Sequence, residues 1–225
     1  MRSGTTVFGD LLAKHPDITW LGEAFAERAY WPVRYLDGLG RSSPTRCFGL
    51  KIFSFQLCKK WQTPTEGYSE CDIDRGRRIL DELLTRKWKF ILLRRAYHFA
   101  QCVSLTRAAQ SGEWHRLEER GAADDRARLN LFRFELYLKH LQIFRKYEEE
   151  LFSAIAKLEL SYESDLLNPE NHQATADKAF EHLRLPSIMV SSRYAKLAAS
   201  RLDEQIENYD EVARIAERLG VRPSL

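Results

Sequence analysis

The sequence is short of several features that would define a specialised class of protein. Only 4 of its 225 residues are cysteine, no two of them form a CxxC pair, and none has metal-ligand spacing. So few cysteines do not build a disulfide scaffold, and we expect a reducing compartment. No apolar run approaches the about 18 residues of a membrane span, and the first residues lack the apolar core of a signal peptide. The sequence therefore predicts a cytoplasmic protein without a transmembrane segment.

A large excess of charge of one sign is also missing. The 35 basic and 32 acidic residues leave a net charge of +3, far below that of a protein whose whole surface follows nucleic acid. Hydrophobic residues make up 44% and charged residues 30% of the chain, which is ordinary globular usage and excludes collagen, coiled coil and full disorder. We therefore expect no nucleic acid partner, and any anion-binding site must be local.

No internal repeat and no long Pro-, Gly- or Ser-rich linker divides the chain, which predicts one domain over residues 1–225. Short apolar segments with aromatic and β-branched residues predict strands over residues 48–55, 88–93 and 158–162. Helical periodicity is expected over residues 5–14, 129–155, 177–185 and 204–219. Alternating strands and helices predict an α/β fold with a parallel sheet covered by helices. The long helix at 129–155 could pack in the core or form the face of a homodimer.

The N-terminal segment places one cation, one glycine and three hydroxyls at the start of an amphipathic helix: Arg2, Ser3, Gly4, Thr5 and Thr6. Unpaired backbone N–H groups and the helix dipole attract anions there, so this loop is a candidate cradle for phosphate or sulfate. Simple capping of the helix would use the same residues. A nucleoside triphosphatase P-loop needs lysine directly after the glycine, where Thr5 stands, and this argues against ATP or GTP hydrolysis.

A second candidate anion site follows the strand that ends in the motif LLRR. Arg94 and Arg95 stand at the end of this strand, and Ser104 lies in the helix that follows. Ligands of open α/β sheets bind outside the carboxyl ends of the strands, so both candidate sites could face one crevice and hold two phosphates of one nucleotide. The alternative is that the two arginines are ordinary surface charges.

Several motifs follow one another between residue 1 and about residue 212: RSGTT, HPDITWLGEAF, LLRR, QCVSLTRAAQSGEW, LSYESDLLNP and QIENYDEV. In this order they resemble the sulfotransferase superfamily that depends on 3′-phosphoadenosine 5′-phosphosulfate (PAPS), in particular its bacterial carbohydrate branch, which is trehalose 2-sulfotransferase-like. The resemblance implies a P-loop-like three-layer sandwich around a central parallel sheet. It also implies transfer of a sulfuryl group from PAPS to a hydroxyl of a carbohydrate or glycolipid, with 3′,5′-ADP as product and no metal.

The resemblance assigns the donor site to three parts of the chain. The loop from Arg2 to Thr6 would bind the 5′-phosphosulfate, with Arg2 near the bridging oxygen. An arginine after the strand would bind the 3′-phosphate together with Ser104, and Tyr162 would lie near the adenine. Ser104 stands nine residues after Arg95 and ten after Arg94, whereas many members use a shorter spacing, so the choice between the two arginines stays open.

On the acceptor side, the resemblance makes Glu23 the expected general base, because a sugar hydroxyl is a poor nucleophile until a carboxylate takes its proton. The alternative is a solvated surface glutamate. Lys51 is expected near the substrate, where its charge would offset negative charge in the transition state, and Phe53 stands where another branch keeps a histidine base. Tyr30 and Trp31 are candidates for acceptor binding. The segments 30–44 and 112–128 are expected to be loops that set acceptor specificity, and the histidine of the HPDI turn is expected to be structural.

One departure from the superfamily concerns the sheet. Its members have a parallel strand that runs directly into the phosphosulfate loop, and residues 1–225 hold no counterpart of that strand. We therefore expect either a reading frame that starts further upstream or a sheet with a gap, poor stability and weak PAPS binding. Two other functions remain open. One is a catalytically impaired relative that binds a nucleotide or a partner protein, and the other is a P-loop-like kinase or nucleotidase.

Overall fold

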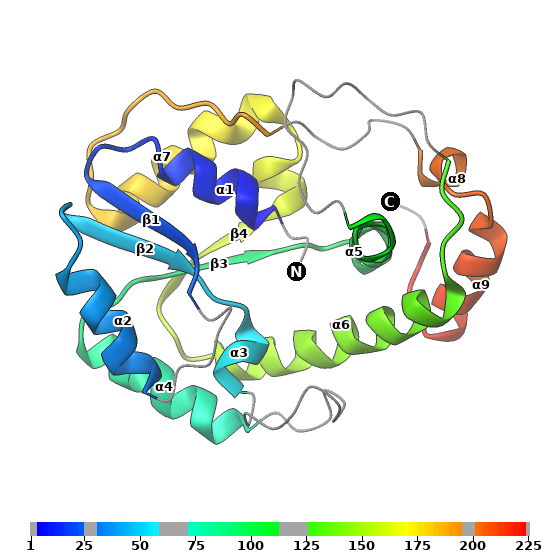
Figure 1. Ribbon diagram of the computed structural model, residues 1–225, viewed down its shortest axis with the longest axis horizontal. Helices are drawn as coiled ribbons and strands as arrows, with labels where there is room; N and C mark the ends of the chain where they lie inside the picture. Colours follow the sequence, from blue (N-terminus) through cyan, green and yellow to red (C-terminus); the bar gives the residue numbers. More distant parts are fainter. Residues whose placement is uncertain (1–3, 25–30, 59–71, 113–125, 195–200, 224–225) are drawn as a thin grey trace.

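The computed structural model describes residues 4–24, 31–58, 72–112, 126–194 and 201–223. Helices surround four short strands in this part of the chain (Figure 1). None of the helices in these ranges combines the length with the hydropathy that a membrane span requires. The elements, in chain order, are α1 (Thr5–Leu12), β1 (Ile18–Glu23), α2 (Pro32–Arg41), β2 (Cys47–Lys51), α3 (Ser54–Cys58), α4 (Ile73–Thr85), β3 (Phe90–Arg94), α5 (His98–Ser111), α6 (Leu131–Leu151), β4 (Lys157–Ser161), the π-helical turn η2 (Tyr162–Leu166), the 3₁₀ turn η3 (Pro169–Asn171), α7 (His172–Leu183), α8 (Leu202–Gln205) and α9 (Tyr209–Arg218).

The four strands form two parallel pairs. Strand β1 pairs with β2, with Ile18 opposite Cys47, and β3 pairs with β4, with Phe90 opposite Lys157. The arrowheads of all four strands point toward the same side of the molecule (Figure 1). This confirms the α/β class with parallel pairing. Among the described residues, the strands form two separate two-stranded sheets, and the single central sheet of the expected three-layer sandwich is not seen.

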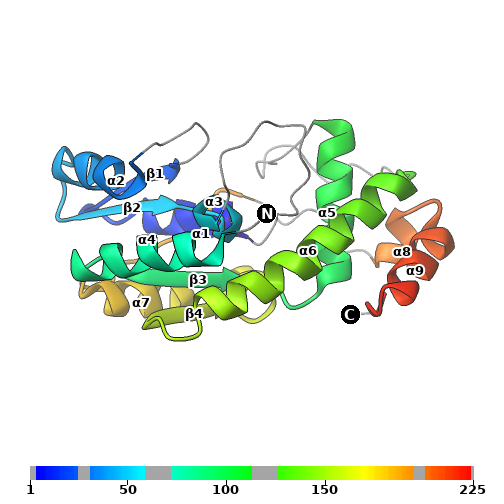
Figure 2. The same ribbon diagram turned by 90° about the horizontal axis from the view of Figure 1, so that it is seen from below.

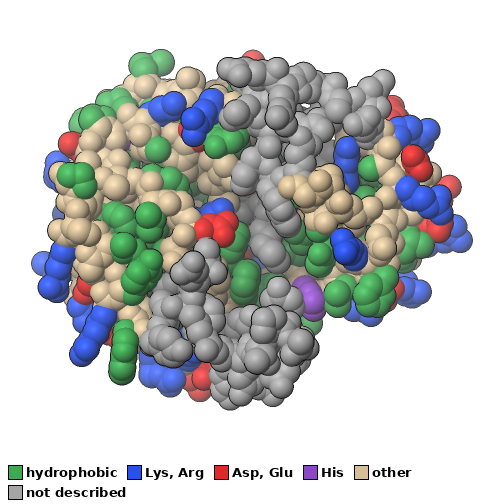
Figure 3. All heavy atoms as spheres, viewed as in Figure 1, with side chains coloured by type: hydrophobic (Ala, Val, Ile, Leu, Met, Phe, Trp, Pro, Cys, Tyr) green, Lys and Arg blue, Asp and Glu red, His purple; other side chains and the backbone are tan. Residues whose placement is uncertain are grey.

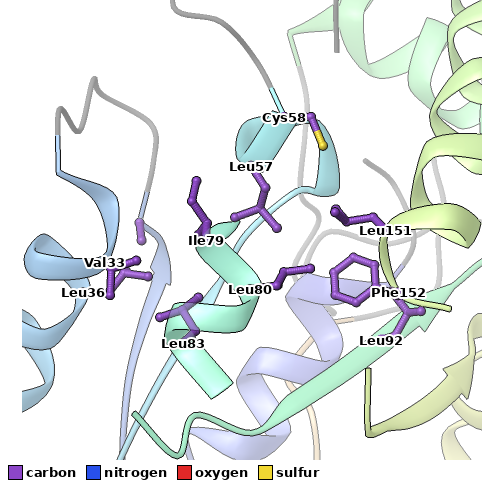
Figure 4. Close-up of a cluster of buried hydrophobic side chains, with 11 residues drawn as sticks. Val33, Leu36, Leu57, Cys58, Ile79, Leu80, Leu83, Leu92, Leu151 and Phe152 are labelled. Atoms are coloured by element: carbon purple, nitrogen blue, oxygen red, sulfur yellow. The ribbon is translucent and has the colours of Figure 1, made fainter. Parts of the chain in front are cut away.

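Helices cover both sides of the strands. Helices α1 and α7 lie on one side, where Leu11 and Phe180 are buried in one apolar cluster (Figure 1). Helices α2, α3 and α4 and the end of α6 lie on the other side and form a second cluster (Figure 4), in which Leu80 of α4 packs near Phe152. The two clusters place apolar side chains above and below the strands, as a parallel sheet requires.

Helix α6 connects the strands to a third apolar cluster. It extends from the strands to α9 (Figure 2), where its residues Phe134 and Leu138 are fully buried against α5 and the C-terminal segment. One face of α6 therefore packs in the core, which is one of the two alternatives expected for this helix. Its other face leaves Phe132 77% exposed.

Several strand and helix predictions are confirmed, and others were wrong. The predicted helices at 5–14 and 129–155 and the strands at 88–93 and 158–162 correspond to α1, α6, β3 and β4. The predicted strand at 48–55 ends at Lys51, because the Gln56 side chain accepts a hydrogen bond from the Phe53 N–H (2.8 Å) and starts α3. The predicted helix at 204–219 is interrupted: α8 ends at Gln205, and Asn208 bonds to the chain at Leu129 instead (2.9 and 3.0 Å).

Two further corrections concern the segments near Glu23. Residues 18–23, expected only as part of a motif, form strand β1. The segment 30–44, expected to be a loop, contains helix α2, which has Pro32 in its first turn, where proline fits the helix start. Most of the other expected loop, 112–128, lies outside the described residues.

Candidate functional site

A cavity of about 280 Å³ lies between the two strand pairs, and its lining residues divide into two parts. Its polar part lies where the strands end and α1 begins, and it includes Thr5, Lys51, Arg94, Arg95 and Arg145, with Glu148 as its acidic residue. The remaining wall is mainly apolar. Four cations lie at this end, and the carboxylates of Glu23, Glu148 and Glu163 pair with them, which leaves an excess of one positive charge. This excess favours an anionic ligand, at the edge of the strands where α/β proteins bind ligands.

The start of α1 faces this polar end. Its N-cap residue is Gly4, which has a left-handed backbone (φ 83°) and makes no side-chain cap. A Cβ atom on Gly4 would lie 2.5 Å from the Tyr162 ring and 3.1 Å from Leu166. Only glycine fits this close approach, which brings the first turn of α1 onto the turn after β4. The first N–H groups of a helix have no partner inside it, and the start of a helix is for this reason a common place for an anion to bind.

Arg95 lies in the same corner. Its guanidinium carbon is 4.6 Å from the centre of the Tyr162 ring, and its Nε is 3.5 Å from Glu163. Burial lowers the pKa of Arg95, and the nearby Tyr162 and Glu163 partly offset this effect. A cation held away from water beside an aromatic ring is suited to bind a phosphate and an adjoining base.

Glu163 fixes the loop that carries Arg95. Its two carboxylate oxygens accept hydrogen bonds from the N–H groups of Ala96 (2.8 Å) and Tyr97 (3.3 Å), just before α5. Ser161 donates a further hydrogen bond to it (3.1 Å). The carboxylate therefore joins the end of β4 to the end of β3 and sets the position of Arg95.

Arg94 points to a different partner. Its Nε donates to Glu148 of α6 at 2.9 Å, and Arg145 lies 3.8 Å from the same carboxylate. His98, the first residue of α5, also lines this end of the cavity. Burial and the charge of Arg145 lower the pKa of His98, so the imidazole is neutral at neutral pH. Arg94 and Arg95 thus both line the cavity, but Arg95 lies beside Tyr162.

Glu23 and Lys51 form an ion pair at the ends of β1 and β2. The Lys51 Nζ lies 2.7 Å from a Glu23 carboxylate oxygen, and 14% of the lysine side chain is exposed against 41% of the glutamate. The ammonium also lies 5.1 Å from the centre of the Phe53 ring. Gly22, with φ 83°, lies at the irregular end of the ladder where Glu23 comes opposite Lys51. The carboxylate is therefore held near the cavity and still reaches solvent.

Some of the predicted site residues lie outside the described ranges, and others lie away from the polar end of the cavity. Arg2, Ser3 and Tyr30 lie outside the described residues. Thr6 lies half-buried in α1, and Ser104 lies half-buried on α5, outside the described lining of the cavity. Trp31 is 70% exposed before α2. On the face shown in Figure 3, hydrophobic side chains gather over the region of β1, β2 and α2.

The histidine of the HPDI turn has a structural environment. His15 is 2% exposed, its Nε2 lies 3.1 Å from the Pro186 carbonyl, and its Nδ1 accepts the Asp17 N–H at 3.1 Å. These contacts support the expected structural role.

Sequence reasoning missed Glu163, Arg145, Glu148 and His98. A signal existed only for Glu163, which directly follows Tyr162 in the motif SYES. The contribution of α6 depends on how that helix crosses the strands, which spacing along the chain does not encode. Within the described ranges, no group of three or more His, Cys, Asp and Glu side chains could hold a metal ion.

Comparison with known proteins gives one family. The family model described as Stf0 sulphotransferase matches residues 13–211. The matched range includes Glu23, Lys51, Arg95 and Tyr162 and begins after Gly4. No curated protein and no solved structure matches the chain.

Proposed function

Because the chain belongs to the Stf0 sulphotransferase family, we propose that it transfers a sulfuryl group from PAPS to a hydroxyl of a carbohydrate or glycolipid acceptor. The observation that carries this proposal is the junction of three elements at one end of the cavity. There Gly4 of the α1 turn contacts Tyr162, and Tyr162 in turn lies under the guanidinium of Arg95. A helix N-terminus, an aromatic ring and a buried cation are what a phosphorylated nucleotide requires.

The residues present fit such a donor. The N-terminus of α1, with Thr5 in the cavity wall, would hold the phosphosulfate together with Arg2 and Ser3, which precede it in the sequence. Tyr162 and Arg95 would hold the adenine and the 3′-phosphate. The contact with Tyr162 favours Arg95 over Arg94 for this role, because Arg94 is engaged with Glu148 on α6.

Glu23 is the proposed general base. Its carboxylate lies at the end of β1, and the ion pair with Lys51 at 2.7 Å orients it. As the acceptor oxygen bonds to sulfur and the bond between sulfur and the bridging oxygen breaks, the hydroxyl proton would pass to Glu23. Lys51 would offset the negative charge that develops beside it, so positioning and electrostatics supply the catalysis.

Acceptor binding is proposed for the aromatic residues that follow this base, Tyr30 and Trp31. Trp31 is exposed, and the Arg34 guanidinium lies 5.6 Å from the centre of its ring. An exposed indole face can stack on a sugar ring. We propose that the enzyme works in the cytoplasm.

Isothermal titration of 3′,5′-ADP into the full chain tests the donor site. We expect micromolar binding that falls at least about tenfold in Arg95→Ala, since one charge-assisted contact contributes about 1.5 kcal/mol or more. Arg77→Ala is the matched control, because Arg77 forms ion pairs with Asp74 and Glu150 and is 46% exposed. Equal affinity of the Arg95 and Arg77 variants would exclude Arg95 from the site.

The same titration, combined with an assay of sulfate transfer, separates an active enzyme from a catalytically impaired relative. Binding of 3′,5′-ADP together with sulfate transfer to a panel of sugars supports the enzyme. Binding without any transfer supports a catalytically impaired relative that holds a nucleotide. No binding by a folded chain contradicts both.

A further inference from the structure

Three phenylalanine rings line the cavity next to the ion pair of Glu23 and Lys51. The centre of the Phe53 ring lies 5.1 Å from the Lys51 ammonium. The ring centres of Phe53 and Phe55 lie 5.6 Å apart with nearly parallel planes (8°), and the Phe144 ring lies 5.3 Å from that of Phe55. All three residues belong to the lining of the cavity. We call these three rings the phenylalanine wall, and one of its ends lies beside the proposed general base.

Two elements hold the phenylalanine wall in place. At the start of α3, the Phe53 N–H donates to the Gln56 side chain (2.8 Å), and the Gln56 N–H donates to the Phe53 carbonyl (2.8 Å). Helix α3 lies against α6 (Figure 1), which contributes Phe144, a residue that is 8% exposed. A wall that is fixed by its own protein loses little conformational freedom when a ligand binds.

The phenylalanine wall has no group that can form a hydrogen bond with a ligand. Leu141, one turn before Phe144 on α6, also lines the cavity and extends the apolar surface. Hydroxyl groups of a sugar that faced these side chains would lose water and gain no partner. An alkyl chain has no such group, and burial of its methylene groups is favourable. The wall is therefore suited to the apolar part of a ligand.

The position and length of the phenylalanine wall define the ligand further. Its Phe53 end meets the pair of Glu23 and Lys51, so a ligand on the wall has its polar part there. The wall extends over three successive rings, 5.6 and 5.3 Å apart, which is longer than a single aromatic ring. An extended chain uses this length better than an aryl group does.

We propose that the phenylalanine wall is an acceptor subsite that binds the alkyl chain of a glycolipid while a hydroxyl of its sugar lies at Glu23. The proposal rests on the proposed function for the role of Glu23. Among carbohydrate and glycolipid acceptors, it selects those that carry an alkyl chain.

Titration of octyl β-D-glucoside into the full chain, below its micelle concentration, tests the subsite by calorimetry. We expect it to bind at least about tenfold more tightly than methyl β-D-glucoside, because its additional methylene groups leave water. Phe55→Ala should reduce this difference to about threefold or less, since it removes the central ring of the wall. Phe55→Leu keeps a large apolar side chain and should retain most of the difference.

Phe90→Ala is the matched control. Phe90 is half-buried like Phe55 and also lines the cavity, but it lies at the start of β3, at the other end of this strand from Arg94. Its ring packs with Phe152 at 6.4 Å. This variant should retain the difference between the two glucosides. Melting temperatures of all three variants show whether each is folded.

Four outcomes would overturn the proposal. Two are equal affinity for the octyl and methyl glucosides, and an unchanged difference in Phe55→Ala. The third is a difference lost to the same extent in Phe90→Ala, which would place the chain between the strands. The fourth is equally tight binding of phenyl β-D-glucoside, which would replace the alkyl chain with an aryl group.

The donor titration keeps this proposal apart from the proposed function. Normal binding of 3′,5′-ADP with no preference for the octyl glucoside would reject the subsite alone. A preference that depends on Phe55 without binding of 3′,5′-ADP would reject the donor site alone. When octyl glucoside serves as acceptor, Phe55→Ala should raise its KM and leave kcat unchanged, because the wall binds a part of the acceptor that does not react.

Discussion

The carboxylate of Glu23 is paired with the Lys51 ammonium group at 2.7 Å. In Glu23→Gln we expect the turnover number for sulfate transfer to fall by about 10²- to 10⁴-fold, the usual contribution of a general base. Affinity for 3′,5′-ADP should not change, because Glu23 lies on the acceptor side of the proposed site. Steady-state kinetics and calorimetry on one preparation measure both quantities.

Glu159→Gln is the control for this prediction. Glu159 forms a comparable pair with Lys157 (3.0 Å), on β4 and 55% exposed, and it is not among the described residues that line the cavity. Its variant should retain full turnover. Full turnover in Glu23→Gln as well would assign the base to another residue.

Gly4 combines an unusual backbone with a close contact. In Gly4→Ala we expect a loss of about 1–3 kcal/mol in the free energy of unfolding, because alanine disfavours φ 83° and its Cβ would meet the Tyr162 ring at 2.5 Å. Affinity for 3′,5′-ADP should fall with it, as the turn moves away from Tyr162. Urea unfolding and calorimetry measure the two effects.

Gly112→Ala separates the two causes. Gly112 has φ 74° and no atom within 4 Å of the added Cβ, so only the backbone cost applies there. A Gly4→Ala variant no less stable than Gly112→Ala and with full affinity would show that the contact with Tyr162 has no role.

At the scale of single residues, the sequence indicated which side chains lie together better than what holds them in place. The resemblance carried by the LLRR and LSYES motifs predicted Tyr162 and one of Arg94 and Arg95 as ligand residues, and the guanidinium carbon of Arg95 lies 4.6 Å from the centre of the Tyr162 ring. It did not indicate that Glu163 holds the loop of Arg95, because that function depends on N–H groups 66 and 67 residues away in the chain.

At the scale of elements, prediction succeeded where a segment carries its own signal. Helix α6 has a long apolar period, and β3 is a short run of large apolar residues. Strand β1 has a weak signal because its sequence, ITWLGE, includes a glycine and a glutamate, and it is stabilised by β2, which lies beyond α2. Pairing between distant segments therefore decided the elements that the sequence alone left undefined.

The segment 185–194 is tied to α1 by one carboxylate. Asp10, with 7% of its side chain exposed, accepts hydrogen bonds from the Ser192 hydroxyl (3.1 Å) and the Arg193 N–H (2.9 Å) and pairs with the Arg193 guanidinium (3.3 Å). In Asp10→Ala these donors lose their partner. We expect a loss of about 1–3 kcal/mol in the free energy of unfolding and faster tryptic cleavage after Arg193.

Asp203→Ala serves as the control for this variant. Asp203 pairs with Arg201 at 2.8 Å and is 39% exposed, so its removal should change stability by no more than about 0.5 kcal/mol. Cleavage after Arg193 at the parent rate in Asp10→Ala would show that other contacts hold this segment.

At the scale of the whole molecule, three helices each carry a histidine whose pKa is lowered in the folded state. Burial is the main cause that lowers the pKa of His98 on α5, His140 on α6 and His182 on α7. Arg145 adds to the effect at His98, and Lys89 adds to it at His182. Below about pH 6.5 the unfolded chain therefore binds more protons than the folded chain.

The sign of the pH dependence follows from this difference. Where the unfolded state binds more protons, stability rises with pH. The free energy of unfolding should therefore reach its maximum above about pH 7 and fall as the pH drops through 6.5. Carboxylates with lowered pKa, such as Glu135 and Asp165, remain ionised between pH 7.5 and 5.5, so the histidines dominate this window.

Urea unfolding at pH 7.5, 6.5 and 5.5 measures the effect. His140→Gln should weaken the dependence, and 0.5 M NaCl should leave most of it, because burial is not screened by salt. A free energy of unfolding that stays constant or rises toward pH 5.5 would contradict this account of all three histidines.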